Sequence, residues 1–472
     1  MTFRLAPGVE LRSSGAGRFL VSRRPVRAVR VNDALFRLLS REGAIRAEGP
    51  AEARALEALA GAGYLERQGS GAEEGWPIPS VTVIIPVMDR AEELGRCLRS
   101  LERVRYPREL LEVIVVDDGS ADDSVAVARA HGASVVASGG RGLGPASSRN
   151  RGARAARGEI LAFVDSDCTA SSGWLEELVG RFGDPEVAAV GGRVEGMHVA
   201  TRLDRYEAQM SSLSLGVRER SEKGGDDTFY LPTCNLLVRK QAFLAAGGFR
   251  EGMHVGEDVD LAWRLRDRGW RLVYSPVGWV WHEHRNRLGA FLTRRFEYGT
   301  SEALLHRLHP ARRKRLAVPL GPAVALTLAC AAALGGGWTW LVAAGLTVLV
   351  DGAAARPRFA RQGLRLGFWS ASAARLRVTA SLGYYLGYHL IRYYSVPLLL
   401  TGLLAPRAGA LAAGVLVATA AIDYHVRRPS LAFAWFLLFY TGEQLAYGAG
   451  AFWGCLRARS FGSYRVMASA KA

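Results

Sequence analysis

The stretch Gly158-Glu-Ile-Leu-Ala-Phe-Val-Asp-Ser-Asp167 decides the fold, because an apolar segment runs directly into two carboxylates. The five apolar residues 160–164 are typical of a strand that is buried on both faces. Asp165 and Asp167 are two residues apart, so in an extended segment their side chains project to one side. Such a pair can bind one divalent metal ion together with diphosphate oxygens. The stretch therefore predicts a metal and diphosphate site at a strand end.

The residues around this stretch alternate between apolar strands and helical segments. We expect strands at 81–87, 111–116, 134–137 and 159–164, and helices at 91–101, 124–130 and 146–156. This rhythm predicts an α/β fold with a mostly parallel, Rossmann-like sheet covered on both faces. Ligands of such sheets bind at the carboxyl ends of the strands. Asp89 and Asp118 follow two of the other strands and should therefore lie near Asp165 and Asp167.

Five successive motifs in this region carry a family resemblance. They are VIIPV at 83–87, VVDDGS at 115–120, ASSRNRG at 146–152, GEILAFVDSD at 158–167 and GEDVDLAWR at 256–264. Together, and in this order, they resemble the signatures of the inverting family 2 glycosyltransferases, which have the GT-A fold. The resemblance implies a metal-dependent hexosyltransferase that uses a nucleoside diphosphate sugar, here a UDP-sugar.

The resemblance also implies roles for individual residues. Nucleotide-sugar binding is expected of Pro86, Asp89, Asp118, Arg149 and Asp165, with Asp118 beside the uracil and ribose. Asp167 is expected to bind the metal, Mn²⁺ or Mg²⁺. Contacts with the acceptor are expected of Asn235, which could instead bond only a turn, and of Glu257. For Arg149 the alternative is a solvated helix face.

Inverting transfer needs a base, because the attacking sugar hydroxyl sheds its proton as the diphosphate leaves from the other face. The resemblance assigns this role to Asp258. Its neighbours Glu257 and Asp260 have the alternative role of acidic residues at a helix start.

A second metal ligand is expected in the segment Trp281-His-Glu-His284. His282 and His284 alternate onto one face of a strand, and the family often has a histidine here that approaches the metal or the diphosphate. We assign this role to His282. Further along, residues 291–296 read FLTRRF where processive polysaccharide synthases carry QxxRW. This difference favours short products, while Arg294 or Arg295 could still hold phosphate.

The chain beyond residue 310 is strongly hydrophobic. An uncharged run at 316–334 is long enough to cross a bilayer, whereas the run at 338–350 is short and could be re-entrant. Arginines flank the pair on both sides, which predicts a hairpin with cytosolic ends. Further apolar runs contain His389, Arg392 and Glu443, which make full spanning doubtful. We therefore expect a membrane-associated helical region at 311–472, with membrane lipid as a partner.

The chain before the catalytic region forms a small module of its own. Residues 1–70 show strands at 19–21 and 26–31, helices at 32–39 and 51–62, and a closing strand at 64–66. This pattern resembles the winged-helix-like PqqD-like domains, which bind a peptide by adding it to a strand edge; the alternative is a plain packing unit. A Gly-rich linker at 69–75 separates it from the glycosyltransferase domain expected at 76–310.

Composition limits the remaining choices. The chain has 472 residues, 49% of them hydrophobic, and its net charge of +17 is compatible with nucleic acid, anionic lipid or a phosphorylated substrate. The hydrophobic runs favour the membrane. Nucleic acid is not expected, because helix 32–39 offers only Arg37 to read bases. The N-terminus lacks the pattern of a signal peptide, so we expect the catalytic domain on the cytoplasmic side of the cell membrane.

The combination of modules narrows the acceptor. A peptide-recognition-like module, a family 2 domain and a short hydrophobic region resemble the glycosyltransferases of mycofactocin systems. That resemblance implies transfer of glucose from UDP-glucose, as a β-1,4-linked chain, to a peptide-derived redox cofactor or its precursor peptide. The alternative is a membrane glycosyltransferase that builds a cell-envelope glycan or glycolipid.

Overall fold

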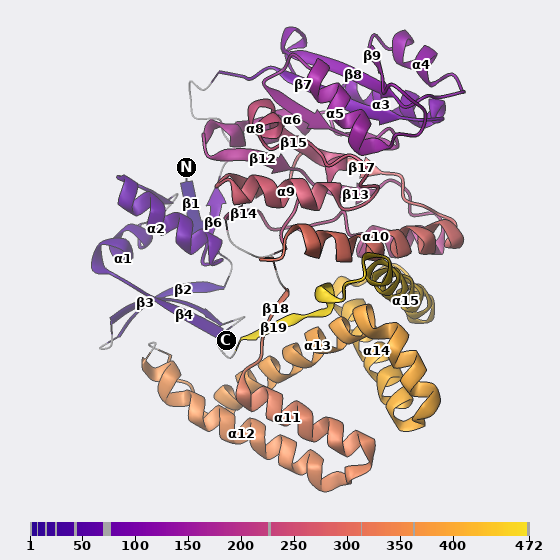
Figure 1. The fold of residues 1–472 in the computed structure, drawn as a ribbon. Coiled ribbons are helices and arrows are strands. Elements are labelled where there is room, and N and C mark those ends of the chain that lie inside the picture. Colours follow the sequence, from indigo (N-terminus) through magenta and orange to yellow (C-terminus); the bar gives the residue numbers. More distant parts are fainter. Residues whose placement is uncertain are drawn as a thin grey trace. The chain divides into compact units, whose positions relative to one another are not determined.

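The structure is a computed structural model. It describes residues 2–469 except 7, 15–16, 24–25, 42–44, 69–76, 225–227, 313 and 362–363. The chain forms two compact units (Figure 1). The central unit comprises residues 70–314 and 427–465, and the terminal unit comprises 1–69, 315–426 and 466–472. The expected linker at 69–75 lies outside the described residues.

An eight-stranded mixed sheet forms the middle of the central unit. Its order is β14 (Arg220–Lys223), β16 (Arg271–Tyr274), β12 (Val187–Gly191), β15 (Leu236–Arg239), β10 (Ile160–Phe163), β7 (Val81–Val87), β8 (Leu111–Asp117) and β9 (Ser134–Ala137). Strands β10, β7, β8 and β9 are parallel, as the sequence predicts. β15 runs antiparallel to both of its neighbours, and β14 runs antiparallel to β16. The α/β fold expected from the sequence is confirmed, with a mixed sheet.

Helices cover both faces of this sheet, and β7 shows why. Val83 and Ile85 point into one core with Leu94 of α3 (Ala91–Leu101), whereas Ile84 points into a second core with Ala153 of α5 (Pro145–Ala155). Successive strand residues face opposite sides, so an all-apolar strand needs cover on both. The remaining helices that pack on the sheet are α4 (Ser124–Ala130), α6 (Trp174–Val179), α8 (Lys240–Ala245) and α9 (Glu257–Asp267). The expected helix at 146–156 begins one residue earlier.

A small three-stranded sheet extends the carboxyl end of β10. It consists of β11 (Cys168–Ala170), β17 (Val280–His282) and β13 (Val194–Gly196). β11 is antiparallel to β17, and Cys168 lies directly opposite His282 in the register. This pairing places the end of the expected metal segment beside the predicted histidine.

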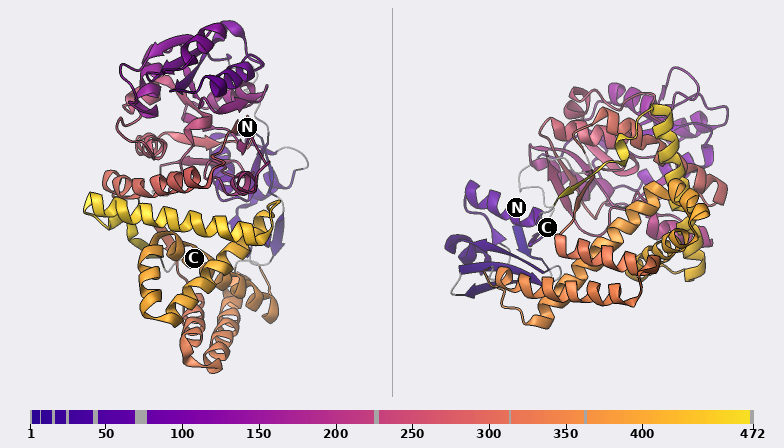
Figure 2. Two further views of the ribbon diagram at one scale, coloured as in Figure 1. Left: turned by 90° about the vertical axis from the view of Figure 1, so that its right-hand side faces the viewer. Right: turned by 60° about the horizontal axis from the view of Figure 1, so that its bottom comes forward.

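Two long helices pack tightly against each other in the central unit. α10 (Leu288–Leu308) and α15 (Phe433–Ala458) lie side by side in both views (Figures 1 and 2). A Cβ atom at Gly450 would overlap the carbonyl oxygen of Phe296, and one at Gly299 would overlap that of Tyr447. Glycine therefore allows the two backbones to touch. The expected membrane-associated zone 311–472 is thus divided between the two compact units, and the three-zone division stays a prediction.

The N-terminal part of the terminal unit contains two three-stranded antiparallel sheets and two helices. One sheet is β5 (Ile45–Arg46), β1 (Thr2–Leu5) and β6 (Leu65–Gln68); the other is β2 (Val9–Ser14), β3 (Gly17–Arg23) and β4 (Val26–Val31). Helix α1 (Asp33–Leu39) begins after Asn32, whose side chain accepts a hydrogen bond from Leu35 N, and α2 (Pro50–Gly61) follows. The strands β1, β2 and β5 are additions to the pattern expected from the sequence.

The rest of the terminal unit is helical, apart from a two-stranded sheet of β18 (Lys314–Ala317) and β19 (Val466–Ser469). Its helices are α11 (Leu320–Ala331), α12 (Trp338–Arg361), α13 (Phe368–Leu404) and α14 (Pro406–Arg427). Among the described helices, α12 and α14 are long and apolar enough to cross a membrane.

The helices α11 and α12 differ in length from the spans that the apolar runs predict. The expected spanning run at 316–334 yields a helix of only 12 residues plus one distorted turn, whereas the run thought too short continues to Arg361. Asp351 within α12 is paired with Arg375 at 2.5 Å, which compensates its charge and lets the helix continue.

Candidate active site at the carboxyl ends of the strands

Arg149 connects two of the predicted site carboxylates. Its Nη2 donates to Oδ1 of Asp165 at 2.6 Å, and its Nη1 donates to Oε1 of Glu257 at 2.9 Å. The side chain is 4% exposed, which excludes the solvated helix face considered above. Burial raises the pKa of Asp165, but the charge of Arg149 outweighs it, so the pKa lies below its usual value. Asp165 is therefore ionised at neutral pH.

Asp258 lies at the start of α9, next to this ion-pair chain. Gly256 precedes the helix in the left-handed conformation, with φ of 82°, and the first turn that follows carries three acidic residues, Glu257, Asp258 and Asp260. Burial and the adjacent negative charge of Glu257 raise the pKa of Asp258 to about 7. A carboxylate with such a pKa can accept a proton at neutral pH. Glu257 is instead buried against Arg149, so its contacts stabilise the site, and its acceptor role stays a prediction.

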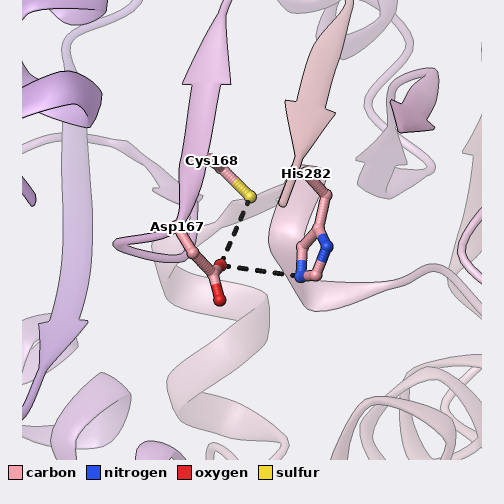
Figure 3. A group of neighbouring side chains, drawn as sticks. All are labelled: Asp167, Cys168 and His282. Atoms are coloured by element: carbon pink, nitrogen blue, oxygen red, sulfur yellow. Dashed lines mark hydrogen bonds and ion pairs between the residues drawn. The ribbon is translucent and has the colours of Figure 1, made fainter. Parts of the chain in front are cut away.

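Asp167 and His282 meet as the sequence predicts, and Cys168 joins them (Figure 3). Oδ1 of Asp167 lies 3.5 Å from Nε2 of His282, while Oδ2 accepts a hydrogen bond from Arg90 at 3.0 Å. The carboxylate, thiol and imidazole ligand atoms lie within 4.8 Å of one another. Carboxylate oxygen and imidazole nitrogen are both ligands of divalent cations such as Mn²⁺. The residues present therefore fit a divalent metal ion.

The second ring nitrogen of His282 faces another histidine. Its Nδ1 lies 3.3 Å from Nδ1 of His284. Burial, together with the neighbouring His282 and Arg295, lowers the pKa of His284 to about 3, so His284 is neutral. This contact orients the His282 ring with Nε2 toward Asp167.

Pro86 and Asp89 lie on the nucleotide side predicted for this sheet. Pro86 is a half-buried residue of β7, opposite Val116 in the register. Asp89 follows the strand with a positive φ of 53°, and its carboxylate accepts from Ala121 N at 2.6 Å and pairs with Arg141 at 3.0 Å. Asp89 thereby connects the loops after β7, β8 and β9.

Asp118 holds the loop that precedes α5. Its carboxylate accepts three hydrogen bonds, from the Ser138 hydroxyl at 2.7 Å, from Leu143 N at 3.0 Å and from Gly144 N at 2.8 Å. The residue is 6% exposed. These contacts fix the glycine-rich loop 139–144, and a contact of Asp118 with uracil or ribose stays a prediction.

Asn235 is a core residue in this structure. Its Oδ1 accepts from the Trp174 indole at 2.8 Å, and its Nδ2 donates to the carbonyl oxygens of Arg193 and Gly278 at 2.9 and 2.8 Å. Both amide hydrogens are thus used within the protein, and the residue is 1% exposed. The contacts give Asn235 a role in joining strand ends, and its contact with the acceptor stays a prediction.

A buried charge cluster lies behind His284, and the sequence pattern did not indicate it. Arg295 of α10 donates to Glu207 of α7 (Arg202–Met210) at 2.6 Å and lies 3.4 Å from Glu443 of α15. Tyr206 donates to the other oxygen of Glu443 at 2.7 Å. Arg295 is only 5% exposed, whereas Arg294, which pairs with Glu297 at 3.1 Å, is 34% exposed and is the more accessible of the two for a phosphate.

Two contacts of Asp167 also escaped the sequence analysis. Arg90 follows the first strand of the domain and pairs with Asp167, 77 residues away. Cys168 directly follows Asp167 in the sequence, but only its register with His282 turns it toward the site. In the sequence, the position of Cys168 directly after the segment 165–167 is the one feature that could have indicated its place in the site.

Comparison with known proteins identifies the family of this chain. Residues 82–244 match the model of the family described as glycosyl transferase family 2. Pre-mycofactocin glycosyltransferase of Mycobacterium tuberculosis is 35% identical over 398 residues, covering 82% of this chain and 81% of the relative. Glycosyltransferase AglE of Haloferax volcanii is 31% identical over 234 residues, covering 48% of this chain and 73% of the relative.

A solved structure is also similar. The mannosyltransferase PcManGT from Pyrobaculum calidifontis, in complex with GDP-Man and Mn2+, is 21% identical, and the match covers 66% of this chain and 88% of that chain with a TM-score of 0.40. The family resemblance seen in the motifs is confirmed by the family model and by the long match to the Mycobacterium relative. This chain therefore belongs to glycosyl transferase family 2 and is similar over most of its length to pre-mycofactocin glycosyltransferase.

Proposed function

We propose that this protein is an inverting glycosyltransferase that transfers glucose from UDP-glucose to pre-mycofactocin, the peptide-derived precursor of a redox cofactor, and extends it as a β-1,4-linked chain. The observation that carries the proposal is the length of the match to pre-mycofactocin glycosyltransferase. It covers 82% of this chain, far more than the residues 82–244 that match the family model. The similarity therefore includes segments outside the shared catalytic domain.

Asp258 is the proposed base. The acceptor hydroxyl oxygen attacks the anomeric carbon, its proton passes to the Asp258 carboxylate, and the bond from the anomeric carbon to the diphosphate oxygen breaks with its electron pair on the diphosphate. The raised pKa of Asp258, about 7, supports this role because the group can take up a proton at neutral pH. Attack from the face opposite the leaving group inverts the anomeric configuration.

Asp167 and His282 are the proposed ligands of a divalent cation, Mg²⁺ or Mn²⁺. When bound, the cation supplies electrostatic stabilisation of the diphosphate. Arg149 keeps Asp165 ionised and in place beside this site, through the 2.6 Å hydrogen bond described above. Arg294, half-buried in the second turn of α10, is the proposed protein cation for a phosphate oxygen.

The N-terminal module is proposed to bind the peptide-derived acceptor. In its sheet β2–β3–β4, the strands β2 and β4 are the outer ones, and a peptide can add to such an edge through main-chain hydrogen bonds. This arrangement supports the resemblance to PqqD-like domains.

Membrane association is the second part of the proposal. The helices α12 and α14 support it by length and composition, and arginines such as Arg356, Arg358 and Arg361 at the end of α12 favour a cytoplasmic catalytic unit. The same helices favour one competing function, transfer of a sugar to a lipid-linked acceptor in the cell envelope.

The two functions are separated by offering both acceptors to one enzyme preparation. Purified protein with Mn²⁺ or Mg²⁺ is incubated with UDP- and GDP-sugars and either pre-mycofactocin or a membrane lipid extract, and the products are analysed by mass spectrometry. We expect stepwise hexose additions to pre-mycofactocin from UDP-glucose. The variant Asp258→Asn should lose about a hundredfold to ten-thousandfold in rate. The exposed Asp123 supplies a matched control, Asp123→Asn, which should keep the rate. Glycosylated lipid with unmodified pre-mycofactocin would overturn the cofactor assignment.

A further inference from the structure

Cys168 adds a soft ligand to a site whose other two side chains suffice for Mg²⁺ or Mn²⁺. Cys168 and His282 are direct partners in the antiparallel pair of β11 and β17, so their side chains lie on the same face of the small sheet. Asp167 precedes Cys168, and its Oδ1 lies 3.9 Å from the Cys168 sulfur. Figure 3 shows all three side chains pointing toward one another. Oxygen, sulfur and nitrogen donors thus converge on one point.

The donor spacing is closer to that of a tetrahedral ion than to that of an octahedral one. Zinc bonds of about 2.0 to 2.3 Å at tetrahedral angles separate neighbouring donors by about 3.3 to 3.5 Å. In the structure Oδ1 of Asp167 lies 3.5 Å from Nε2 of His282 and 3.9 Å from Sγ of Cys168. Octahedral Mg²⁺ with bonds of about 2.1 Å needs adjacent oxygens about 3.0 Å apart. The oxygen–nitrogen separation thus fits Zn²⁺, and the sulfur, which lies within 4.8 Å of the imidazole nitrogen, must move about 0.4 Å closer to the oxygen.

The surroundings leave these donors directed at one another. Arg90 binds Oδ2 of Asp167 and leaves Oδ1 facing the sulfur and the imidazole. His284 faces Nδ1 of His282, so Nε2 is the nitrogen turned toward the carboxylate. Three protein donors with a fourth position for water or substrate oxygen are the arrangement found in catalytic zinc sites.

We propose that Asp167, Cys168 and His282 form a mixed oxygen, sulfur and nitrogen site that binds thiophilic divalent cations of the Zn²⁺ and Cd²⁺ class. Thiolate ligands select such ions over Mg²⁺ and Mn²⁺. The thiol proton passes to solvent when the metal–sulfur bond forms. Because the site shares Asp167 and His282 with the cation of the proposed reaction, Zn²⁺ competes with that cation and inhibits transfer. Only this inhibition rests on the proposed function; ion binding does not.

Ultraviolet absorption of the Cd²⁺-loaded protein tests the binding. A cadmium–thiolate bond gives a charge-transfer band that oxygen and nitrogen ligands do not give. The experiment uses full-length protein with Cys330→Ser, because Cys330 is the exposed thiol among the five cysteines. We expect a band that saturates at one Cd²⁺ per chain and disappears with Cys168→Ser. It should remain with Cys234→Ser, a matched control at another buried cysteine beside the site.

Two results would overturn the proposal: no band in the Cys330→Ser protein, or an equal band after Cys168→Ser. Circular dichroism and the unfolding midpoint without metal show whether Cys168→Ser is folded. If it is not, X-ray absorption of the Zn²⁺-loaded Cys330→Ser protein replaces it. One sulfur scatterer at about 2.3 Å supports the site, and a shell of only oxygen and nitrogen contradicts it.

A kinetic experiment tests the competition separately. At fixed Mg²⁺, Cys168→Ser should need at least about tenfold more Zn²⁺ than the parent protein for half-inhibition. Equal sensitivity would contradict the competition. Failure of every tested sugar transfer would count against the proposed function alone, since the cadmium band is measured without substrate.

Discussion

The guanidinium of Arg149 donates a hydrogen bond to the carboxylate of Asp165 across 2.6 Å. The other end of the same guanidinium holds Glu257, the residue before the proposed base, at 2.9 Å. The buried Arg149 thus connects the segment 165–167 after β10 to the first turn of α9. Because Arg149 and Glu257 are buried and Glu257 directly precedes Asp258, the position of Asp258 depends on Arg149.

Replacing Arg149 by Lys should disable the site although the charge is kept. A lysine ammonium lacks the planar fork that reaches two carboxylates at once. We expect kcat/KM to fall at least about a hundredfold, because the geometry of Asp258 and Asp165 is lost. Arg149→Met should also lower the free energy of unfolding by about 3–5 kcal/mol, since the buried Glu257 and the partly buried Asp165 lose their partner.

The matched control is Arg154→Lys on the same helix. The Arg154 side chain is 58% exposed and lies 3.9 Å from Glu251, so its ion pair contributes little. Steady-state kinetics and denaturant unfolding of both variants check this prediction. Equal losses at the two positions would mean that bridging by Arg149 is unimportant.

The pH dependence of the rate should report Asp258. The base acts when deprotonated, and its pKa is raised to about 7 by burial and by Glu257. We therefore expect log kcat/KM to rise with unit slope below about pH 7 and to level off above it. Asp258→Asn should flatten this limb and leave a small residual rate. A limb unchanged in Asp258→Asn would assign the titration to another group.

Asp258 should also make the free energy of unfolding depend on pH, and the direction of its pKa shift fixes the sign of this dependence. The pKa of Asp258 is raised above its ordinary value of 3.8, so between pH 3.8 and about 7 the folded protein holds a proton that the unfolded chain has released. The contribution of this group to stability therefore falls as the pH rises through that window. Asp258→Asn removes this dependence. Its free energy of unfolding relative to the parent protein should increase from pH 4 to 7 and then stay constant, which urea unfolding at several pH values can measure.

The buried cluster on α10 and α15 predicts an asymmetry between two substitutions. Arg295 is the cation that neutralises Glu207 and Glu443, whose side chains are only 5% and 7% exposed. Arg295→Met leaves both acids without it and should cost about 3–5 kcal/mol. Glu443→Gln keeps a carbonyl for the Tyr206 hydroxyl and leaves one cation with one anion, so it should cost about 1 kcal/mol. Denaturant unfolding of the two variants measures this difference. Equal losses of unfolding free energy would contradict this view of the cluster.

The contact between α10 and α15 can be tested at two glycines. A methyl group at Gly450 would overlap the backbone of Phe296, so Gly450→Ala should destabilise the central unit by about 1–3 kcal/mol. Gly289 of α10 has open space around its Cβ position, and Gly289→Ala should be neutral or stabilise by up to about 1 kcal/mol. Thermal unfolding of the two variants checks the difference. A neutral Gly450→Ala would show that α15 is not packed as described.

The sequence predicts those elements whose residues carry a local apolar pattern. The strands 81–87 and 134–137 and the helices 91–101 and 124–130 have the expected bounds. β2 escaped prediction because its sequence VELRSS is half polar and resembles a loop. The length of α12 was underestimated because Asp351 interrupts the apolar run, and its partner Arg375 comes from another helix.

The site is predictable only where its residues follow a strand end. Asp165 and Asp167 follow β10 of the large sheet, and His282 ends β17, which joins them because it pairs with β11, the strand directly after Asp167. The charge pairs that position them join residues far apart in sequence, such as Arg149 and Glu257, 108 residues from each other. Composition also suggested that the last apolar helix belongs with the membrane region, whereas Glu443 and the glycines of α15 anchor it in the central unit. Such partners depend on the tertiary fold and leave no local pattern.

Proton NMR of the transfer reaction is the most direct test of inverting glucose transfer to pre-mycofactocin by Asp258. Wild-type protein and Asp258→Asn are incubated with UDP-glucose and pre-mycofactocin in a buffer that contains Mg²⁺ but no Mn²⁺. The anomeric signals are followed over time. We predict that the α-anomeric signal of the donor is replaced by a β-anomeric signal on pre-mycofactocin, and that the variant shows almost no change. An α-linked product, or equal rates in both proteins, would contradict the account.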